Sequence, residues 1–128
     1  MVKQTGIIPD PKDGPYLYLF NHQSLFDHFV IGTYINHYVT AVAKHEHLSY
    51  PLWGQVAKFY GIVPINRTNI KKALSSLKVV EDSITNDKVS VLIAPEGTRS
   101  RDGHLGIFKK GAFHIAKNTG VKIIPVII

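Results

Sequence analysis

The segment Asn21–Asp27 holds a histidine and an aspartate whose spacing suits acid–base chemistry. His22 directly follows the apolar run Tyr16–Phe20. Ser24 is expected to cap a helix, which places Asp27 in the first turn of that helix, within reach of the imidazole. A carboxylate bonded to one ring nitrogen fixes the tautomer and leaves the other nitrogen to take a proton from a substrate hydroxyl. The pair is a candidate general base, although the spacing alone also fits a helix-capping aspartate beside an ordinary loop histidine.

No conventional nucleophile accompanies His22. The chain contains no cysteine, which excludes a thiolate nucleophile, a disulfide framework and thiolate metal sites. The hydroxyl of Ser24 is expected to be engaged with helix amides. We therefore favour direct attack by a substrate hydroxyl over a covalent enzyme intermediate. No metal site is predicted, because the seven histidines lack the ligand spacing of zinc helices.

A second polar loop, Pro95–Arg101, has the composition of a phosphate-binding turn. Gly97 permits close backbone approach, Thr98 offers a hydroxyl, and Arg99 or Arg101 can grip a phosphate with two hydrogen bonds. A polar turn with ion-paired arginines is the alternative. A base and a phosphate loop together imply a substrate with both a hydroxyl and a phosphate. Glycerol phosphate and its monoacyl esters fit this description, and other phosphorylated alcohols stay open.

The net charge of +6 is concentrated toward the C-terminal part of the sequence. Residues 97–128 carry six lysines and arginines, including Lys109 and Lys110, against Asp102 alone. Such a segment suits an anionic partner such as a phosphate, an anionic membrane or a nucleic acid, or it is simply a solvated basic face. We expect no nucleic-acid partner, because the basic residues follow a loop suited to a small phosphate rather than lining a helix.

Short apolar runs alternate with helical patterns along the chain. The expected strands are residues 16–20, 39–43, 62–65, 89–94 and 121–128, and the expected helices are residues 25–38, 51–60, 68–85 and 108–118. Pro64 predicts an edge or irregular strand, and Gly120 a helix C-cap. The alternation predicts an α/β fold with a mostly parallel sheet flanked by helices. Both polar loops would then lie at the carboxyl ends of strands, where sites form in such sheets.

Four blocks in this order resemble the glycerol-3-phosphate and 1-acylglycerol-3-phosphate (lysophosphatidate) acyltransferase superfamily. The blocks are Asn21-His22 through Asp27, Gly61 through Arg67, Glu96 through Ser100, and Pro125 between Ile124 and Val126. Their order and spacing agree from about Tyr16 to Ile128. Four ordered blocks are more specific than any one of them, and they outweigh the capping and polar-turn alternatives.

The resemblance implies transfer of a fatty acyl group from acyl-CoA or acyl-carrier protein to the hydroxyl of 1-acylglycerol 3-phosphate, making phosphatidic acid without a metal or redox cofactor. By the same resemblance His22 is the general base and Asp27 orients it. The acceptor phosphate site would comprise Arg67, Glu96, Gly97, Thr98 and Arg99. Pro125 would shape a substrate pocket.

The resemblance also implies an association with the cytoplasmic face of a membrane. Residues 1–128 would be a single acyltransferase catalytic core, and we expect a fragment, because full members carry an N-terminal membrane-binding segment and further C-terminal sequence. Pro64 departs from the family, which usually has an aromatic or aliphatic residue there. The alternatives are acylation of glycerol 3-phosphate or another lysolipid, and a non-catalytic module that binds anionic lipid. Trp53, Phe59 and Tyr60 around Lys58 would suit such a module.

Overall fold

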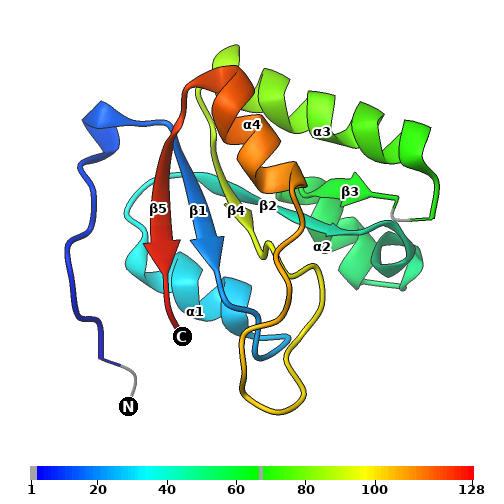
Figure 1. Ribbon diagram of the computed structural model, residues 1–128, viewed down its shortest axis with the longest axis horizontal. Coiled ribbons are helices and arrows are strands. Elements are labelled where there is room, and N and C mark those ends of the chain that lie inside the picture. The colour runs from blue at the N-terminus through cyan, green and yellow to red at the C-terminus, as the bar shows by residue number, and fades with distance from the viewer. Residues whose placement is uncertain (1–2, 67) are drawn as a thin grey trace.

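Five short strands form one sheet in the computed structural model, which describes residues 3–66 and 68–128 (Figure 1). The strands are β1 (Tyr16–Phe20), β2 (Val39–Lys44), β3 (Val63–Ile65), β4 (Ser90–Ile93) and β5 (Lys122–Val126). Their order across the sheet is β3-β2-β4-β1-β5. β1 pairs in parallel with β4 and β5, and β2 pairs in parallel with β3 and β4. The predicted parallel α/β architecture is confirmed.

Helices cover both faces of the sheet. They are α1 (Asp27–Tyr34), α2 (Trp53–Phe59), α3 (Ile70–Thr85) and α4 (Gly111–Thr119), with short 3-10 turns η1 (Pro11–Asp13) and η2 (His45–Ser49). α3 and α4 lie over one face and α1 over the other (Figure 1). The core under α3 and α4 includes Leu17, Val91, Ile93, Val80 and Ile115. The core toward α1 includes Tyr18, Phe20, Leu92 and Ile31.

The central strands are apolar at nearly every position because both of their faces are covered. All five residues of β1 and all four of β4 are buried. α3 is amphipathic, and its N-terminus is capped by the side chain of Asn69, which accepts from the Lys72 amide at 3.1 Å. Gly120 closes α4 with a φ of +70°, as its position predicted. These elements fix where the loops after β1 and β4 begin.

Several helix boundaries differ from those expected. α1 starts at Asp27 without a side-chain cap, and the expected capping role of Ser24 is wrong, because its hydroxyl accepts locally from the Phe26 amide at 3.2 Å. α1 also ends at Tyr34, before residue 38. α2 starts after Leu52, whose φ of +63° is not helical. α4 starts only at Gly111, because the chain before it is bonded back to the loop that follows β4.

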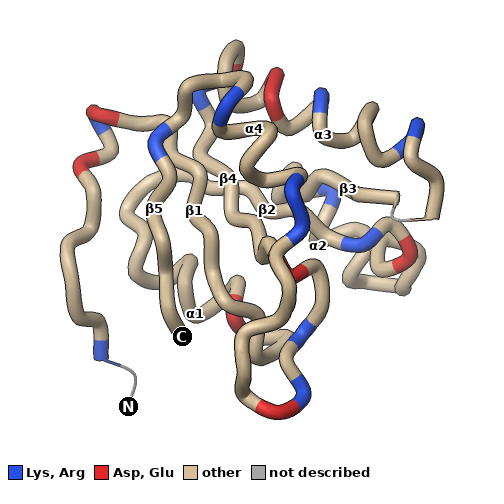
Figure 2. The backbone as a smooth tube through the Cα atoms, viewed as in Figure 1, with Lys and Arg blue, Asp and Glu red and all other residues tan. Residues whose placement is uncertain are grey.

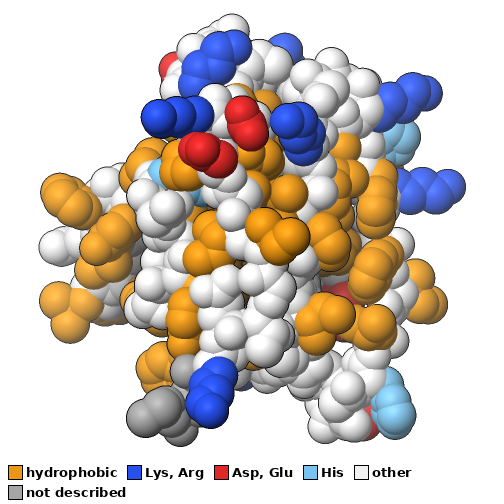
Figure 3. Space-filling model, turned by 90° about the vertical axis from the view of Figure 1, so that its left-hand side faces the viewer, with side chains coloured by type: hydrophobic (Ala, Val, Ile, Leu, Met, Phe, Trp, Pro, Cys, Tyr) orange, Lys and Arg blue, Asp and Glu red, His pale blue; other side chains and the backbone are white. Residues whose placement is uncertain are grey.

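The two edge strands carry the strand prolines. β3 contains Pro64 and forms one edge, as predicted, and β5 contains Pro125 and forms the other. Edge positions tolerate proline because one side of the backbone needs no ladder hydrogen bond. On the β5 side of the molecule apolar side chains are spread over the visible surface (Figure 3). Within the described ranges no helix has both the length and the apolar character needed to cross a membrane.

Candidate active site

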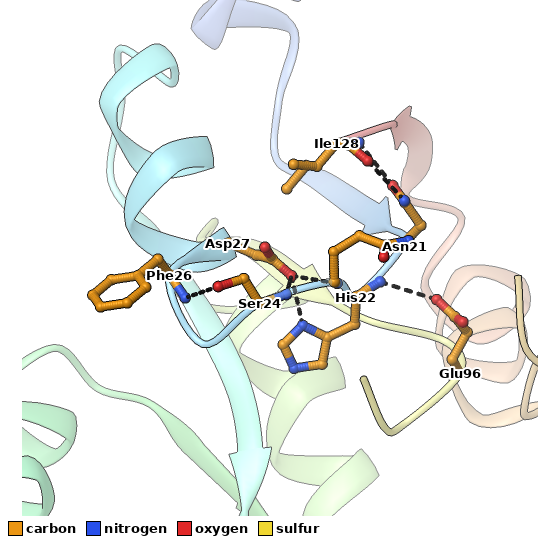
Figure 4. A network of polar contacts seen from close by, with 8 residues as sticks. Asn21, His22, Ser24, Phe26, Asp27, Glu96 and Ile128 are labelled. Atoms are coloured by element: carbon orange, nitrogen blue, oxygen red, sulfur yellow. Dashed lines mark hydrogen bonds and ion pairs between the residues drawn. The ribbon is translucent and has the colours of Figure 1, made fainter. Parts of the chain in front are cut away.

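His22 and Asp27 meet where β1 turns into α1. Nδ1 of His22 lies 2.7 Å from Oδ2 of Asp27 (Figure 4). The same oxygen accepts the backbone N–H groups of Gln23 and Ser24 at 2.7 and 2.9 Å. One carboxylate oxygen of Asp27 therefore accepts three hydrogen bonds from the turn before it. The contact between the carboxylate and the imidazole is the one that the spacing predicted.

The surroundings keep Asp27 ionised. Its side chain is 3% exposed, and this burial raises the pKa of the carboxyl, but the hydrogen bonds from Ser24, His22 and Gln23 outweigh burial and leave the pKa below its usual value. An ionised carboxylate can only accept hydrogen bonds, so Nδ1 of His22 donates to it, and in the neutral imidazole Nε2 then presents its lone pair. No protein group among the described residues pairs with Nε2. This nitrogen is therefore available to take a proton from a ligand.

The rings of two residues, Phe20 and His28, pack against the imidazole of His22. The ring of Phe20 packs edge-on to it with centroids 5.6 Å apart, and the ring of His28 does so at 5.7 Å. Burial lowers the pKa of His28 by more than the nearby Asp27 carboxylate raises it, so His28 is neutral at neutral pH. Sequence reasoning considered His28 only as a metal ligand with His22 and rejected that role, although its position one residue after Asp27 places it on the helix that bears the carboxylate. Among the described residues no group of three or more His, Asp or Glu side chains could hold a metal ion.

The loop after β4 fastens the loop after β1. Oε1 of Glu96 accepts the backbone N–H of His22 at 3.0 Å, and the N–H of Ser100 donates to the carbonyl of His22 at 2.7 Å. The backbone N–H and the carbonyl of His22 are thus both held by the loop after β4. Glu96 in that loop is 74 residues from His22 in the sequence. The imidazole is positioned from both sides, by Asp27 through its ring and by the second loop through its backbone.

Glu96 is a buried charged residue of the second polar loop, and 4% of its surface is exposed. Its second oxygen, Oε2, accepts the N–H of Gly106 at 2.7 Å. A Cβ at position 106 would lie 3.1 Å from that oxygen, so glycine allows the close approach. Both carboxylate oxygens therefore have donors within the protein, which favours a positioning role for Glu96 over contact with a phosphate. Gly106 was missed because a glycine in a polar loop gives no pattern that separates it from other turn glycines.

The remaining predicted residues fall into three places. Gly97, Thr98 and Arg99 lie in the turn after β4, beside His22, where Gly97 has a φ of +71° and its N–H donates to the carbonyl of Ala94 at 3.0 Å. Arg67 lies outside the described residues. Pro125 lies within the sheet, opposite Leu19, rather than in either polar loop.

Asn21 extends the ladder between β1 and β5. Its amide nitrogen donates to the carbonyl of Ile128 at 3.0 Å, and the N–H of Ile128 donates to its amide oxygen at 2.8 Å (Figure 4). The side chain thereby mimics a strand residue and fixes the start of the His22 loop. An open hollow of about 620 Å³ lies alongside, lined by Asn21, Gln23, Gly103, Leu105, Ile127 and Ile128.

The fold and the site together define a class: an α/β protein whose His-Asp pair lies at the carboxyl edge of a parallel sheet and is locked to a glycine- and arginine-containing turn. The model of the Acyltransferase family matches residues 2–128. The chain belongs to this family.

Relatives and a solved structure agree with this assignment. A 1-acyl-sn-glycerol-3-phosphate acyltransferase of Cocos nucifera is 39% identical over 112 residues, covering 88% of this chain and 36% of that protein. The enzyme of the same name from Escherichia coli K12 is 36% identical over 113 residues, covering 88% and 46%. The crystal structure of the 1-acyl-sn-glycerophosphate acyltransferase PlsC of Thermotoga maritima matches with a TM-score of 0.74 and 30% identity, covering 90% and 44%. The chain spans less than half the length of these proteins.

Proposed function

We propose that the protein is an O-acyltransferase that moves a fatty acyl group from a thioester to the hydroxyl of 1-acylglycerol 3-phosphate, forming phosphatidic acid. The observation that carries the proposal is the His22–Asp27 pair, with its free Nε2, fastened to the turn that contains Arg99. In this proposal His22 is the base for the hydroxyl, and Arg99, in the turn bonded to the His22 loop, is a cation for the phosphate. The printed names of the relatives describe the same acceptor.

The arrangement supports a direct transfer. Nε2 of His22 takes the proton of the acceptor hydroxyl as its oxygen attacks the thioester carbonyl. The carbon–sulfur bond then breaks, and the imidazolium returns the proton to the leaving thiolate. The products are the new ester and a free thiol. Asp27 stabilises the imidazolium while it carries the proton and keeps the ring in the correct tautomer.

The turn after β4 would hold the acceptor phosphate. Gly97 allows close backbone approach, Thr98 offers a hydroxyl, and Arg99 supplies a guanidinium. We keep Arg67 in this group on the strength of the family resemblance. Because Ser100 donates to the carbonyl of His22, the phosphate turn and the base are held at a fixed separation.

The donor would be acyl-CoA or acyl-carrier protein, and the transfer as proposed uses proton transfer and electrostatic binding without a metal or redox cofactor. We further propose that the protein works at the cytoplasmic face of a membrane. Support comes from large apolar side chains that stand exposed in and around α1 and α2: Leu25, Phe26, Phe29, Leu52 and Phe59. The apolar lining of the hollow beside Asn21 is also compatible with a lipid chain.

Replacing Arg99 with alanine is expected to raise the KM for 1-acylglycerol 3-phosphate by roughly 10- to 100-fold, because a charged hydrogen bond of about 1.5–3 kcal/mol is lost. Steady-state thiol release at varied acceptor concentration measures this, with Arg101→Ala as the matched control and glycerol 3-phosphate as a second acceptor. An unchanged acceptor KM in the Arg99 variant would remove Arg99 from the site, and a larger effect at Arg101 would move the role there.

Replacing Glu96 with glutamine is expected to lower kcat and leave the acceptor KM nearly unchanged. The amide nitrogen of glutamine would face one of the two backbone N–H groups that now donate to the carboxylate, so the His22 loop loses a hydrogen bond. Unfolding by denaturant should show a loss of about 1.5–3 kcal/mol, typical of a hydrogen bond to a charged group. A raised KM at unchanged kcat and unchanged stability would instead put Glu96 in contact with the acceptor.

A further inference from the structure

Lys109 is hydrogen-bonded to the first residue of the second polar loop, Pro95, which precedes it by fourteen residues. Its backbone N–H donates to the carbonyl of Pro95 at 2.8 Å. The loop that leaves β4 therefore returns to its own start before α4 begins. Basic positions consequently lie on both limbs of this loop (Figure 2).

The side chain of Lys109 lies over the turn glycine. A Cβ built on Gly97 would be 3.2 Å from Cε and 3.2 Å from Nζ of Lys109. Lys109 is an exposed residue, and its ammonium group lies at the turn. Glycine at position 97 leaves the room that the ammonium occupies, and the same turn leads directly into Thr98 and Arg99.

The ammonium has no acidic partner among the described residues. The two nearest acidic residues in the loop are already engaged: both oxygens of Glu96 accept backbone N–H groups, and Asp102 accepts from the Ser100 hydroxyl and the His104 amide. A cation held against a glycine turn without a counter-ion suits an anionic ligand.

We propose that Lys109 binds a phosphate seated on the Gly97 turn, together with Arg99. The inference rests on the proposed function and adds a second cation to its phosphate site. The phosphate has two chemical sources in the reaction, the monoester of the acceptor or the phosphates of a CoA donor. The neighbouring Lys110 precedes α4 directly, and its carbonyl accepts the His114 amide at 3.0 Å. Lys110 is therefore a matched control of the same charge.

The test compares Lys109→Met with Lys110→Met in the full-length chain as its gene encodes it. Methionine keeps an unbranched apolar stem over Gly97 and removes the charge, so a purely structural role would be spared. Binding of glycerol 3-phosphate, followed by NMR chemical-shift titration, is expected to weaken by roughly tenfold in the Lys109 variant and to stay unchanged in the Lys110 variant. This measurement does not depend on turnover, so it reports on Lys109 even where the proposed acyl transfer fails.

Kinetics then distinguish the two sources of phosphate. A KM raised for 1-acylglycerol 3-phosphate identifies the acceptor, and a KM raised for acyl-CoA but not for an acyl-pantetheine thioester identifies the donor. Either result supports a phosphate role for Lys109. Unchanged glycerol 3-phosphate binding together with unchanged KM values for both substrates would overturn the proposal, as would an equal loss in the Lys110 variant.

Discussion

Acyl transfer should fall by roughly 10²–10⁴-fold when His22 is replaced with alanine, while the protein stays folded. The imidazole supplies the free Nε2, and the neighbouring imidazole of His28 has no hydrogen bond to a carboxylate among the described residues that would orient it as a base in its place. The bonds that fasten this loop to Glu96 and Ser100 use the backbone of His22, so alanine keeps them. Thiol release from acyl-CoA in the presence of acceptor measures the loss, and thermal unfolding checks the fold.

The control for this experiment is His104→Ala. His104 is an exposed histidine in the loop between β4 and α4, and its loss should leave the rate unchanged. Turnover retained by a normally folded His22→Ala protein would rule out His22 as the general base. Equal losses in the two variants would point to a general effect of removing a histidine rather than to a base.

Replacing Asp27 with asparagine should also lower kcat by roughly 10²-fold or more, because the neutral amide no longer stabilises the imidazolium or enforces its tautomer. The change costs stability too. Oδ2 of Asp27 accepts from His22, Gln23 and Ser24, and an amide oxygen accepts such bonds more weakly than a carboxylate does. We expect a loss of about 1.5–3 kcal/mol in the free energy of unfolding at pH 7.

The pH dependence of the unfolding free energy separates the contribution of the negative charge of Asp27 from the contribution of its packing. The pKa of Asp27 is lowered in the folded protein, so its charge stabilises the fold above the unfolded pKa of about 3.9 and ceases to do so as pH falls through the folded pKa. The difference in unfolding free energy between wild type and Asp27→Asn should therefore shrink below about pH 4. A variant that is less stable at every pH but turns over normally when folded would make Asp27 a structural residue only.

The architecture was predictable because it depends on local patterns. β1 spans the residues expected of it, since a continuous apolar run bounded by polar residues reads as a strand covered on both faces. The contact between His22 and Asp27 was also predictable, because both residues belong to one short turn whose geometry follows from the start of α1. Information of this kind lies within a few neighbouring residues.

The features that were missed depend on residues far apart in the chain. The bond from His22 to the Glu96 carboxylate spans 74 residues, and nothing in either loop's own sequence indicates it. The family resemblance implies that Glu96 belongs to the phosphate site, and this role stays a prediction; the two backbone N–H groups that donate to its oxygens are what the sequence did not indicate. The start of α4 at Gly111 and the fold of Lys109 over Gly97 likewise follow from one tertiary hydrogen bond to Pro95.

The expected effects at the site are not independent. His22 is held by Asp27 through its ring and by Glu96 through its backbone, so the variants at these positions act on one unit. Residues that act as a unit give non-additive losses in rate. The double variant Asp27→Asn with His22→Ala should therefore be hardly slower than His22→Ala alone.

The most direct test of direct acyl transfer is thiol release from acyl-CoA by the wild-type full-length protein, measured with and without 1-acylglycerol 3-phosphate. We expect thiol to appear only when the acceptor is present, in amounts equal to the phosphatidic acid formed. Failure of the acceptor to stimulate thiol release would contradict the proposed activity. A burst of thiol equal to the protein concentration, without acceptor, would show an acyl-enzyme and contradict attack by the hydroxyl that His22 is proposed to deprotonate.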